Sequence, residues 1–444
     1  MSNDQSISGI NSNNTYTVNF CVNTKLSSEK FPLLCGNKKW DDSDVIDLIS
    51  NHNMGLSLAS GQYEGWSLFV QPNGAWGWNI GDGENRLDYL PTALQIINDG
   101  KWHEIAISFH FNDKTVWLYY DNRHVAIYSL SEINFSDDLV TKNIFFINNS
   151  QINIKDIKSD VSAHPPVKNK SVDFPKNNKA DSEILTVMSW NIWHGGRHNG
   201  IEKGIEQVIS TLKNIDTNII CMQETYGSGP FISDALGTIF YYRSSNLSIH
   251  SKYEIAITHE LFNPFRFGGI RIIINGKFLD VFVLWINYLP EISKLYEADS
   301  VDKIISDENE TRGSEIKEIL GHIQNISVSE PKIPMIIGGD FNSPSHLDWG
   351  NEMKPIHQNL VIEWPVSKSM IDFGFKDSFR ERSPLPYNNI GNTFSSLNPD
   401  SLQHRIDYLY YKGNLKCVNC FVKGYEDLEW PSDHAAVVGE YRFP

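Results

Sequence analysis

The stretch Pro334–Asn342 constrains the fold of this chain more than any other. Its apolar residues predict a buried strand, and Gly338 and Gly339 allow a close approach to the backbone. Asp340 and Asn342 follow two residues apart, so an extended backbone points both side chains the same way. A carboxylate beside a carboxamide at the end of a core strand suits a site that handles water and an oxyanion. The alternative is an ordinary turn, because Gly, Asp and Asn are frequent in turns.

The same pattern recurs through the second part of the chain, where runs typical of core strands end and polar residues follow. Amphipathic stretches near 201–212 and 313–325 predict helices between some of these runs. If the strands pack in sheets, their ends meet at one rim and form an acidic cleft with one imidazole. The polar residues at these strand ends are Asn191, Glu224, Asp340, Asn342, Asp407, Asp433 and His434.

The first part of the chain has a different pattern. Between about residues 16 and 157, short alternating segments are separated by Gly, Asn and Asp, and no long helical period is present. Two β-rich runs, 115–120 and 124–128, flank Asp121 and Asn122, which tolerate a positive φ and predict a hairpin. An all-β sandwich is therefore expected over residues 1–165.

A connection separates the two parts. Residues 166–183 include proline, lysine and asparagine and offer little apolar surface to bury. At 444 residues the chain is too long for one ordinary core, so two domains are expected. We place the first at 1–165 and the second at 184–444, with 166–183 as the linker.

Composition excludes several classes of protein. No apolar run reaches about 18 residues, so no membrane-spanning helix is expected. The N-terminus lacks the basic and apolar regions of a signal peptide. Three alternatives stay open: the protein is cytoplasmic, a signal was removed, or export uses another route. The net charge of −16 disfavours non-specific attraction to polyanions.

The cysteines are few. Their odd number argues against a disulfide framework. Cys417 and Cys420 form a single CxxC, which is explained either by metal or redox chemistry or by two neighbouring thiols near a strand. The full set is Cys21, Cys35, Cys221, Cys417 and Cys420.

The motifs of the second part resemble the endonuclease/exonuclease/phosphatase superfamily, which includes DNase I-like nucleases. They occur in that family's order over 184–444, at 189–191, 222–225, 339–342, 405–408 and 432–434. The resemblance implies a four-layer α/β sandwich, with two mixed sheets packed face to face between outer helices. It also implies hydrolysis of a phosphoester substrate with Mg²⁺ or Mn²⁺.

The resemblance assigns a role to each residue of the set. Glu224 and Asn191 are implied as metal ligands, with Asp433 as a further contributor. Asp340 is the implied general base, and Asn342 is an implied donor to the phosphoryl oxygens. His434 is expected to contact the phosphoryl group, held and charged by Asp407, because a carboxylate raises the pKa of a neighbouring imidazole.

One position departs from the family pattern. After the strand at 281–283, some members carry a histidine that contacts phosphate, whereas this chain has Leu-Trp-Ile-Asn-Tyr at 284–288. Asn287 and Tyr288 are the expected replacement donors. Other candidates for substrate contacts are Thr393, in a loop resembling a substrate-side loop of the family, and the arginines Arg197, Arg243, Arg266 and Arg271. His194 and His198 are either further phosphate ligands or ordinary surface histidines.

The first part resembles the laminin-G/concanavalin-like jelly rolls. The resemblance rests on Asp-Gly-Lys-Trp-His at 99–103, the strand after it, and the hairpin at Asp121 and Asn122. It implies a module that binds a glycan or a protein, with or without calcium. Candidate sugar-stacking residues are Trp66, Trp76, Trp78 and Trp102, which the alternative places in the sandwich interior. Candidate calcium ligands are Asp41, Asp42, Asp44 and Asp47, which the alternative leaves in a solvated loop.

Three functions remain open on the sequence alone. The first is a divalent-metal-dependent phosphodiesterase or phosphatase that acts on a small or lipid-like phosphoester. The second is a DNA or RNA endonuclease, although the Lys and Arg residues are scattered instead of forming a basic stripe. The third is a binding protein without catalysis. We favour the first, because the motif set is complete and no basic face is evident.

Overall fold

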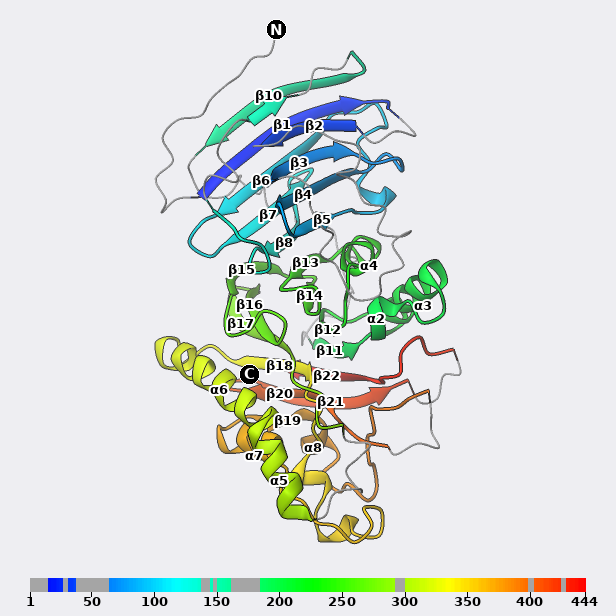
Figure 1. Ribbon diagram of the computed structural model, residues 1–444, viewed down its shortest axis with the longest axis vertical. Coiled ribbons are helices and arrows are strands. Elements are labelled where there is room, and N and C mark those ends of the chain that lie inside the picture. The colour runs from blue at the N-terminus through cyan, green and yellow to red at the C-terminus, as the bar shows by residue number, and fades with distance from the viewer. Residues whose placement is uncertain are drawn as a thin grey trace. The chain divides into compact units, whose positions relative to one another are not determined.

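The computed structural model describes residues 15–26, 31–36, 64–136, 144–146, 150–160, 184–291, 300–397, 403–424 and 429–444 (Figure 1). The candidate calcium ligands Asp41, Asp42, Asp44 and Asp47, and the linker 166–183, lie outside these residues. The chain forms two compact units, one from residues 1–178 and 226–245 and the other from 179–225 and 246–444.

The first unit is built mainly from strands. They are β1 (Thr15–Thr24), β2 (Phe31–Gly36), β3 (Glu64–Val70), β4 (Trp76–Asp82), β5 (Arg86–Tyr89), β6 (His103–His110), β7 (Thr115–Tyr120), β8 (Arg123–Ser129), β9 (Ile144–Phe146), β10 (Ile152–Asp160) and β13 (Ile239–Tyr242). Its helical segments are the 3-10 turn η2 (Ala93–Gln95) and α4 (Gly229–Leu236).

These strands form two sheets. One has the order β10-β1-β6-β7-β8-β13 and the other β5-β4-β3-β2-β9. Every neighbouring pair is antiparallel except β8 and β13, which are parallel. The described part of residues 1–165 is therefore sheet-rich, with no helix longer than η2.

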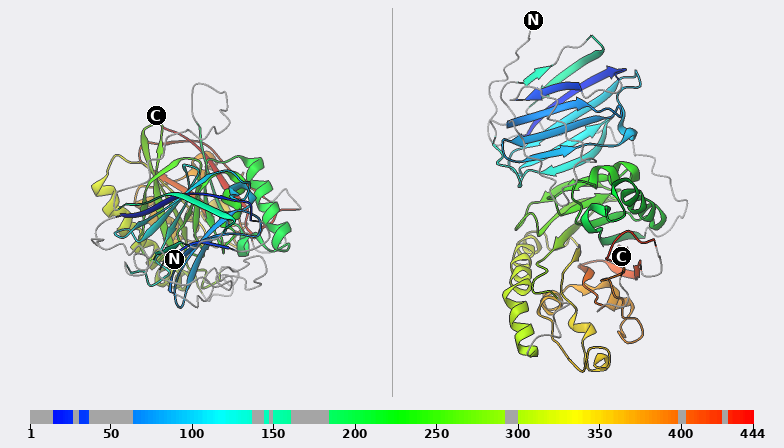
Figure 2. Two further views of the ribbon diagram at one scale, coloured as in Figure 1. Left: turned by 90° about the horizontal axis from the view of Figure 1, so that it is seen from above. Right: turned by 45° about the vertical axis from the view of Figure 1, so that its right-hand side comes forward.

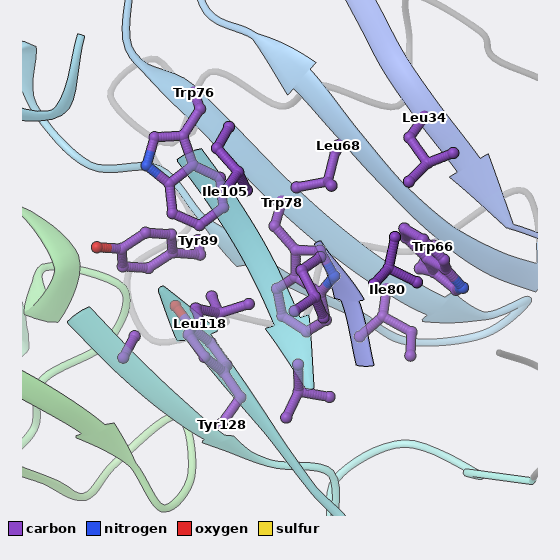
Figure 3. Packing of buried hydrophobic residues seen from close by; sticks show 14 of the residues in the cluster. Leu34, Trp66, Leu68, Trp76, Trp78, Ile80, Tyr89, Ile105, Leu118 and Tyr128 are labelled. Carbon is purple, nitrogen blue, oxygen red and sulfur yellow. The ribbon is translucent and has the colours of Figure 1, made fainter. Parts of the chain in front are cut away.

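Aromatic side chains fill the core of the first unit (Figure 3). Trp66, Trp76 and Trp78 are fully buried, which confirms the expectation that the tryptophans fill the interior at these three positions. The Trp78 ring meets Tyr128 edge-on with the ring centroids 5.4 Å apart. Trp102 differs, because 45% of its surface is exposed.

The Asp-Gly-Lys-Trp-His turn has a structural role. The two ring nitrogens of His103 lie 3.0 Å from Asp99 Oδ1 and 2.9 Å from Asp121 Oδ2. His103 therefore ties the turn before β6 to the hairpin between β7 and β8. Gly100 has a φ of 79°, a conformation that glycine adopts without strain.

Residues 226–245 pack with the first unit, although the sequence predicts them in the second domain. Asp234 of α4 accepts hydrogen bonds from the side chains of Thr92 and Gln95, and Tyr242 donates to Glu132. The backbone of β13 pairs with β8. The boundary at residue 184 therefore does not separate the two units completely.

The second unit alternates strands and helices. Its strands are β11 (Leu185–Asn191), β12 (Ile219–Gln223), β14 (Ser248–Ser251), β15 (Glu254–His259), β16 (Phe267–Ile274), β17 (Lys277–Trp285), β18 (Met335–Asp340), β19 (Lys376–Asp377), β20 (Asp407–Lys412), β21 (Lys416–Lys423) and β22 (Ala436–Arg442). Its helices are α2 (Trp193–Gly196), α3 (Ile201–Ile215), α5 (Val301–Glu310), α6 (Arg312–Ser329), α7 (Pro365–Asp372) and α8 (Ser378–Arg382), with 3-10 turns η4 (His346–Asp348) and η5 (Asn351–Met353).

Two sheets pack face to face in the second unit. One contains β14-β12-β11-β22-β21 in that order, and the other contains β15-β16-β17-β18-β20-β19. Phe282, Leu284 and Ile337 of the second sheet pack against apolar residues of α6 and α7. In the right-hand view of Figure 2, the green and the yellow-green helices of the second unit lie on opposite sides of its strands.

The two sheets approach closely at Gly338. A Cβ atom at this position would lie 2.8 Å from Cys221 Cβ and 3.0 Å from Cys221 Sγ. Cys221 belongs to β12 of the facing sheet, so the missing side chain sets the distance between the sheets. The sequence predicts that another group comes close to the backbone at this glycine pair. At Gly338 that group is Cys221 of the facing sheet.

Gly338→Val is expected to lower the free energy of unfolding by about 1–3 kcal/mol, because overpacked side chains must move apart. Urea denaturation of the purified variant measures this change. The matched control is Gly321→Ala in α6, where an added Cβ meets no atom within 4 Å and should stabilise the helix by roughly 0.5–1 kcal/mol. Equal stability of Gly338→Val and wild type would contradict the close contact.

The described cysteines Cys21, Cys221, Cys417 and Cys420 are free thiols. In β21, Cys417 and Cys420 are both buried, and burial raises the pKa of each thiol. This agrees with the interpretation of two neighbouring thiols in a strand. No helix in the described part of the chain combines the length and apolarity needed to cross a membrane.

Candidate active site

The ends of β11, β12 and β18 meet through one side chain. Asn191 ends β11, Glu224 follows β12, and Asp340 ends β18. Asn191 Nδ2 donates to Glu224 Oε1 at 3.1 Å and to Asp340 Oδ2 at 3.2 Å. Two carboxylates from different sheets therefore share one amide donor, as the strand-end pattern predicts.

Backbone contacts hold Glu224 in position. Its φ is 55°, a left-handed conformation that is uncommon for a residue other than glycine. Its backbone N–H donates to Asn246 Oδ1 at 3.0 Å, and the backbone N–H of His194 donates to its Oε2 at 2.9 Å. The Glu224 carboxylate is therefore held beside the Asn191 side chain by the backbone N–H of His194.

His434 stands on the other side of Asp340. His434 Nδ1 lies 2.9 Å from Asp407 Oδ2, and His434 Nε2 lies 3.9 Å from Asp340 Oδ2. Asp340 and Asp407 are register partners on β18 and β20, so both side chains emerge from one face of the sheet. The indole N–H groups of Trp190 and Trp430 donate to the backbone carbonyl of His434 and fix its position.

The pKa values of Asp340, His434 and Asp433 are all raised. Burial, with the neighbouring carboxylate of Asp407, raises the pKa of Asp340 to about 7. Burial alone would lower the pKa of His434, but Asp407 and Asp340 outweigh it and raise that pKa well above its usual value. Burial also raises the pKa of Asp433, and the nearby Glu224 adds to this effect.

The donor set suits a hard divalent cation. Three carboxylates, those of Asp340, Asp407 and Asp433, lie within 4.0 Å of the His434 ring nitrogens. The buried oxygens Asp407 Oδ1 and Asp433 Oδ1 accept no hydrogen bond from the described residues. Asp340, Asp407 and His434 also place ligand atoms within 4.8 Å of one another. A protonated imidazole cannot bind a metal, so the Glu224 carboxylate fits Mg²⁺ or Mn²⁺ better. Asn191, the other expected ligand, turns its amide nitrogen toward Glu224, and its Oδ1 accepts the backbone N–H of Trp193 at 2.9 Å.

Asn342 and the loop after β17 lie beside this group. Asn342 Nδ2 donates to the Ile286 carbonyl at 2.9 Å, and the Asn342 backbone N–H donates to Asp340 Oδ1. Asn287 donates its backbone N–H to Glu315 and accepts from Leu289 through Oδ1. The Tyr288 side chain is 49% exposed. Both predicted replacement donors are thus in the loop next to Asn342.

Two residues predicted to contact substrate make other contacts instead. Thr393 is fully buried, and its Oγ1 accepts from the backbone N–H groups of Ile406 and Asp407, so it positions the start of β20. Arg271 donates to both oxygens of Asp280 at 2.7 and 3.0 Å. Asp280 pairs with Met335, at the opposite end of β18 from Asp340, so Arg271 is not at the site.

Three other candidates for substrate contacts, Arg243, His194 and His198, lie in different places. Arg243 belongs to the first unit, where it donates to Ser129 and Ser131. His194 is at the rim, with Nδ1 3.9 Å from Glu224 Oε2. The His198 ring stacks on Trp193 with the ring centroids 4.1 Å apart.

Sequence reasoning missed the residues that support the site from behind. Asn246 orients Glu224, and Ser432 donates to the Asn191 carbonyl while accepting from the His434 backbone N–H. Ser432 belongs to the motif at 432–434, which gave it no role of its own. Trp430 lies two residues before that motif, so proximity to the motif was a usable signal. Asn246 is near no motif, and nothing in the sequence distinguishes it.

Two facing sheets that bring an amide, four carboxylates and an imidazole together define a DNase I-like domain with an acidic site at the sheet rim. Residues 188–434, more than half of the chain, match the Endonuclease/Exonuclease/phosphatase family. The chain belongs to this family, whose members are phosphoesterases and nucleases.

Known proteins are similar to this chain in part of its length. An uncharacterised protein of Caenorhabditis elegans is 28% identical over 296 residues, which cover 59% of this chain and 92% of that protein. The crystal structure of truncated C. elegans TDP2 is 18% identical with a TM-score of 0.43, covering 58% of this chain and 97% of that one. An AP endonuclease from Archaeoglobus fulgidus is 20% identical with a TM-score of 0.41, covering 57% and 98%.

Proposed function

We propose that this protein is a divalent-metal-dependent hydrolase of phosphoesters, with a small or lipid-like substrate. The observation that carries the proposal is the position of Asp340. Its carboxylate shares the Asn191 amide with Glu224 and lies 3.9 Å from the imidazole of His434. One carboxylate thus stands between a candidate cation site and a candidate phosphoryl contact.

Asp340 is assigned as the general base. A base works best when its pKa is near the working pH, and the pKa of about 7 meets this condition. The carboxylate accepts the proton of the attacking water. The Asn342 backbone N–H and the Asn191 amide fix its orientation, so the lone pair that takes the proton is positioned in advance.

His434 is assigned as the donor to the phosphoryl oxygen. Its Nδ1–H donates to Asp407, which keeps the ring charged and leaves the Nε2–H to face Asp340 and the reacting group. A fixed donor in a buried site stabilises charge that develops in the transition state. Asn342 has a second amide hydrogen available beside the one given to Ile286.

Glu224, Asn191 and Asp433 are the residues proposed to hold Mg²⁺ or Mn²⁺. When bound, the cation supplies Lewis-acid stabilisation of the phosphoryl oxygens. The His194 backbone N–H and Asn246 hold the Glu224 carboxylate and backbone, which keeps the ligand geometry ready for binding.

The first unit is proposed as a jelly-roll binding module for a glycan or a protein. Trp102 is the aromatic candidate, since it is 45% exposed. Lys155 Nζ lies over one face of the ring, 4.1 Å from its centroid, which leaves the other face for a ligand. An exposed aromatic face is the surface on which sugar rings stack.

The function is tested by incubating the purified chain with a panel of phosphoesters and Mg²⁺ or Mn²⁺. The panel contains bis(p-nitrophenyl) phosphate, sphingomyelin, inositol phosphates, nucleotides, plasmid DNA and RNA. Turnover of a small or lipid-like ester, lost with EDTA, supports the proposal. Selective degradation of nucleic acid would favour a nuclease, and turnover of no substrate would favour a binding protein.

Glu224→Gln is expected to weaken the affinity for Mn²⁺ by about 10–100-fold, since a neutral amide replaces the ligand charge. Isothermal titration calorimetry of the wild type and the variant measures the two dissociation constants. Glu202→Gln, in the first turn of α3, is the matched control and should bind as the wild type does. Equal affinities for all three proteins would remove Glu224 from the cation site.

A further inference from the structure

An aromatic and cationic surface adjoins the candidate active site. We call it the Trp285 shelf, and it consists of Phe265, Arg266, Trp285 and Tyr288. Trp285 ends β17 and is the register partner of Asp340 on β18, so both side chains emerge from the same face of the sheet. The Phe265 and Tyr288 rings lie 5.7 and 6.1 Å from the Trp285 ring, measured between centroids.

The guanidinium of Arg266 lies over the Trp285 ring. Its guanidinium carbon is 4.8 Å from the Trp285 ring centroid, within the range of a cation–π contact. Its nearest carboxylate among the described residues is Glu315, whose Oε1 is 3.6 Å from Nε, too long for a good hydrogen bond. Arg266 Nη1 is buried and has no hydrogen-bond partner among these residues.

Short chains of contacts connect the shelf to the catalytic candidates. Asn246 donates to the Phe265 carbonyl and accepts from the Glu224 backbone N–H. On the other side, the Ile286 backbone N–H donates to the Asp340 carbonyl, and the Ile286 carbonyl accepts from Asn342. The shelf is thus held on both sides by the residues next to the reacting group.

The Arg266 side chain is 21% exposed, but its Nη1 atom is buried, and a buried donor without an acceptor is costly. The aromatic rings position the guanidinium, and its planar fork matches a phosphate in a bidentate way. The carboxylates of the site repel anions, whereas Arg266 attracts them. Arg266 is therefore suited to a second anionic group of a substrate whose first phosphate is at Asp340.

We propose that Arg266, on the Trp285 shelf, binds a second, unreacting phosphate group of the substrate. This inference rests on the proposed phosphoester hydrolysis. The second phosphate belongs either to a soluble molecule with two phosphates or to the next unit of a polynucleotide. Both sources present the same chemistry to the guanidinium.

The test compares two substrates, the p-nitrophenyl ester of thymidine 5′-phosphate with and without a 3′-phosphate. The wild type is expected to prefer the ester with the second phosphate by about 10–100-fold in kcat/KM, the range of a charge-assisted hydrogen bond. Arg266→Gln should bring this ratio close to one, and Arg266→Lys should keep part of it. Arg442→Gln, at the far end of β22, is the control and should keep the full ratio.

Binding measurements test the role of Arg266 even if no substrate is hydrolysed. Thymidine 3′,5′-bisphosphate is expected to bind the wild type about 10-fold or more tighter than thymidine 5′-phosphate in calorimetry, and Arg266→Gln should remove the difference. A bisphosphate advantage that survives in Arg266→Gln, or no advantage in the wild type, overturns the inference. Hydrolysis of both esters with no dependence on Arg266 overturns it while leaving the proposed function intact.

The same experiment with oligonucleotides distinguishes the two sources. A 5′-phosphorylated dinucleotide, which carries two phosphates, indicates a neighbouring phosphate in a chain if it gains as much as the bisphosphate from Arg266. A gain confined to the bisphosphate indicates a small soluble substrate. In both cases Arg266 is the residue that recognises the second phosphate.

Discussion

Asp340→Asn is expected to lower kcat by about 10²- to 10⁴-fold, the usual contribution of a general base. The amide keeps the size of the carboxylate but cannot accept the proton of the attacking water. Steady-state kinetics on the best substrate of the phosphoester panel measures the loss. A kcat within a few-fold of the wild type would show that another group takes the proton.

The same substitution should stabilise the metal-free protein, which separates lost catalysis from lost folding. The folded pKa of Asp340 is raised to about 7, so the folded state holds this proton at pH values where the unfolded state has released it. The contribution of Asp340 to stability therefore falls as pH rises from about 4 to about 7. Urea denaturation in EDTA should show Asp340→Asn more stable than the wild type at pH 8, with a smaller difference at pH 5.

His434→Gln is expected to lower kcat by about 10²- to 10³-fold, the loss typical of one donor to a developing oxyanion. Glutamine keeps an N–H donor, but it carries no charge and cannot keep both the Asp407 contact and the position of Nε2. Single-turnover measurements at saturating substrate isolate this loss from any change in binding.

The control for the His434 prediction is a double-mutant cycle with Asp407, which lies 2.9 Å from His434 Nδ1. If Asp407 acts only by charging and orienting the imidazole, Asp407→Asn should lower kcat in the wild type but add little in the His434→Gln background. Independent, additive losses would assign Asp407 a separate role. A wild-type rate in His434→Gln would remove the imidazole from the reaction.

The residues of the candidate site could be predicted because they stand at the ends of apolar runs in the sequence. Asn191 and Asp340 end core strands, Glu224 follows one and Asp407 begins one, and the end of a strand is where a side chain leaves the sheet for the rim. Local pattern was sufficient for these residues. The assignment of their separate roles stays a prediction.

Non-local contacts explain what the pattern could not predict. Thr393 matches a substrate-side loop in sequence, but its hydroxyl is used by two backbone N–H groups of a distant strand. Arg271 and Arg266 are five residues apart, yet Arg271 makes two hydrogen bonds to Asp280, whereas Arg266 lies over Trp285 with Glu315 3.6 Å away. Residues 226–245 join the first unit because β13 pairs with β8, a pairing that no local propensity encodes.

The most direct test of the central claim is an anomalous diffraction measurement on crystals soaked in MnCl₂. The account predicts a manganese peak in contact with the Glu224 carboxylate and the Asn191 amide, and loss of that peak in Glu224→Gln. A peak on Asp407 and His434 instead, or no peak at this rim, would contradict the claim that these strand ends hold a cation for phosphoester hydrolysis.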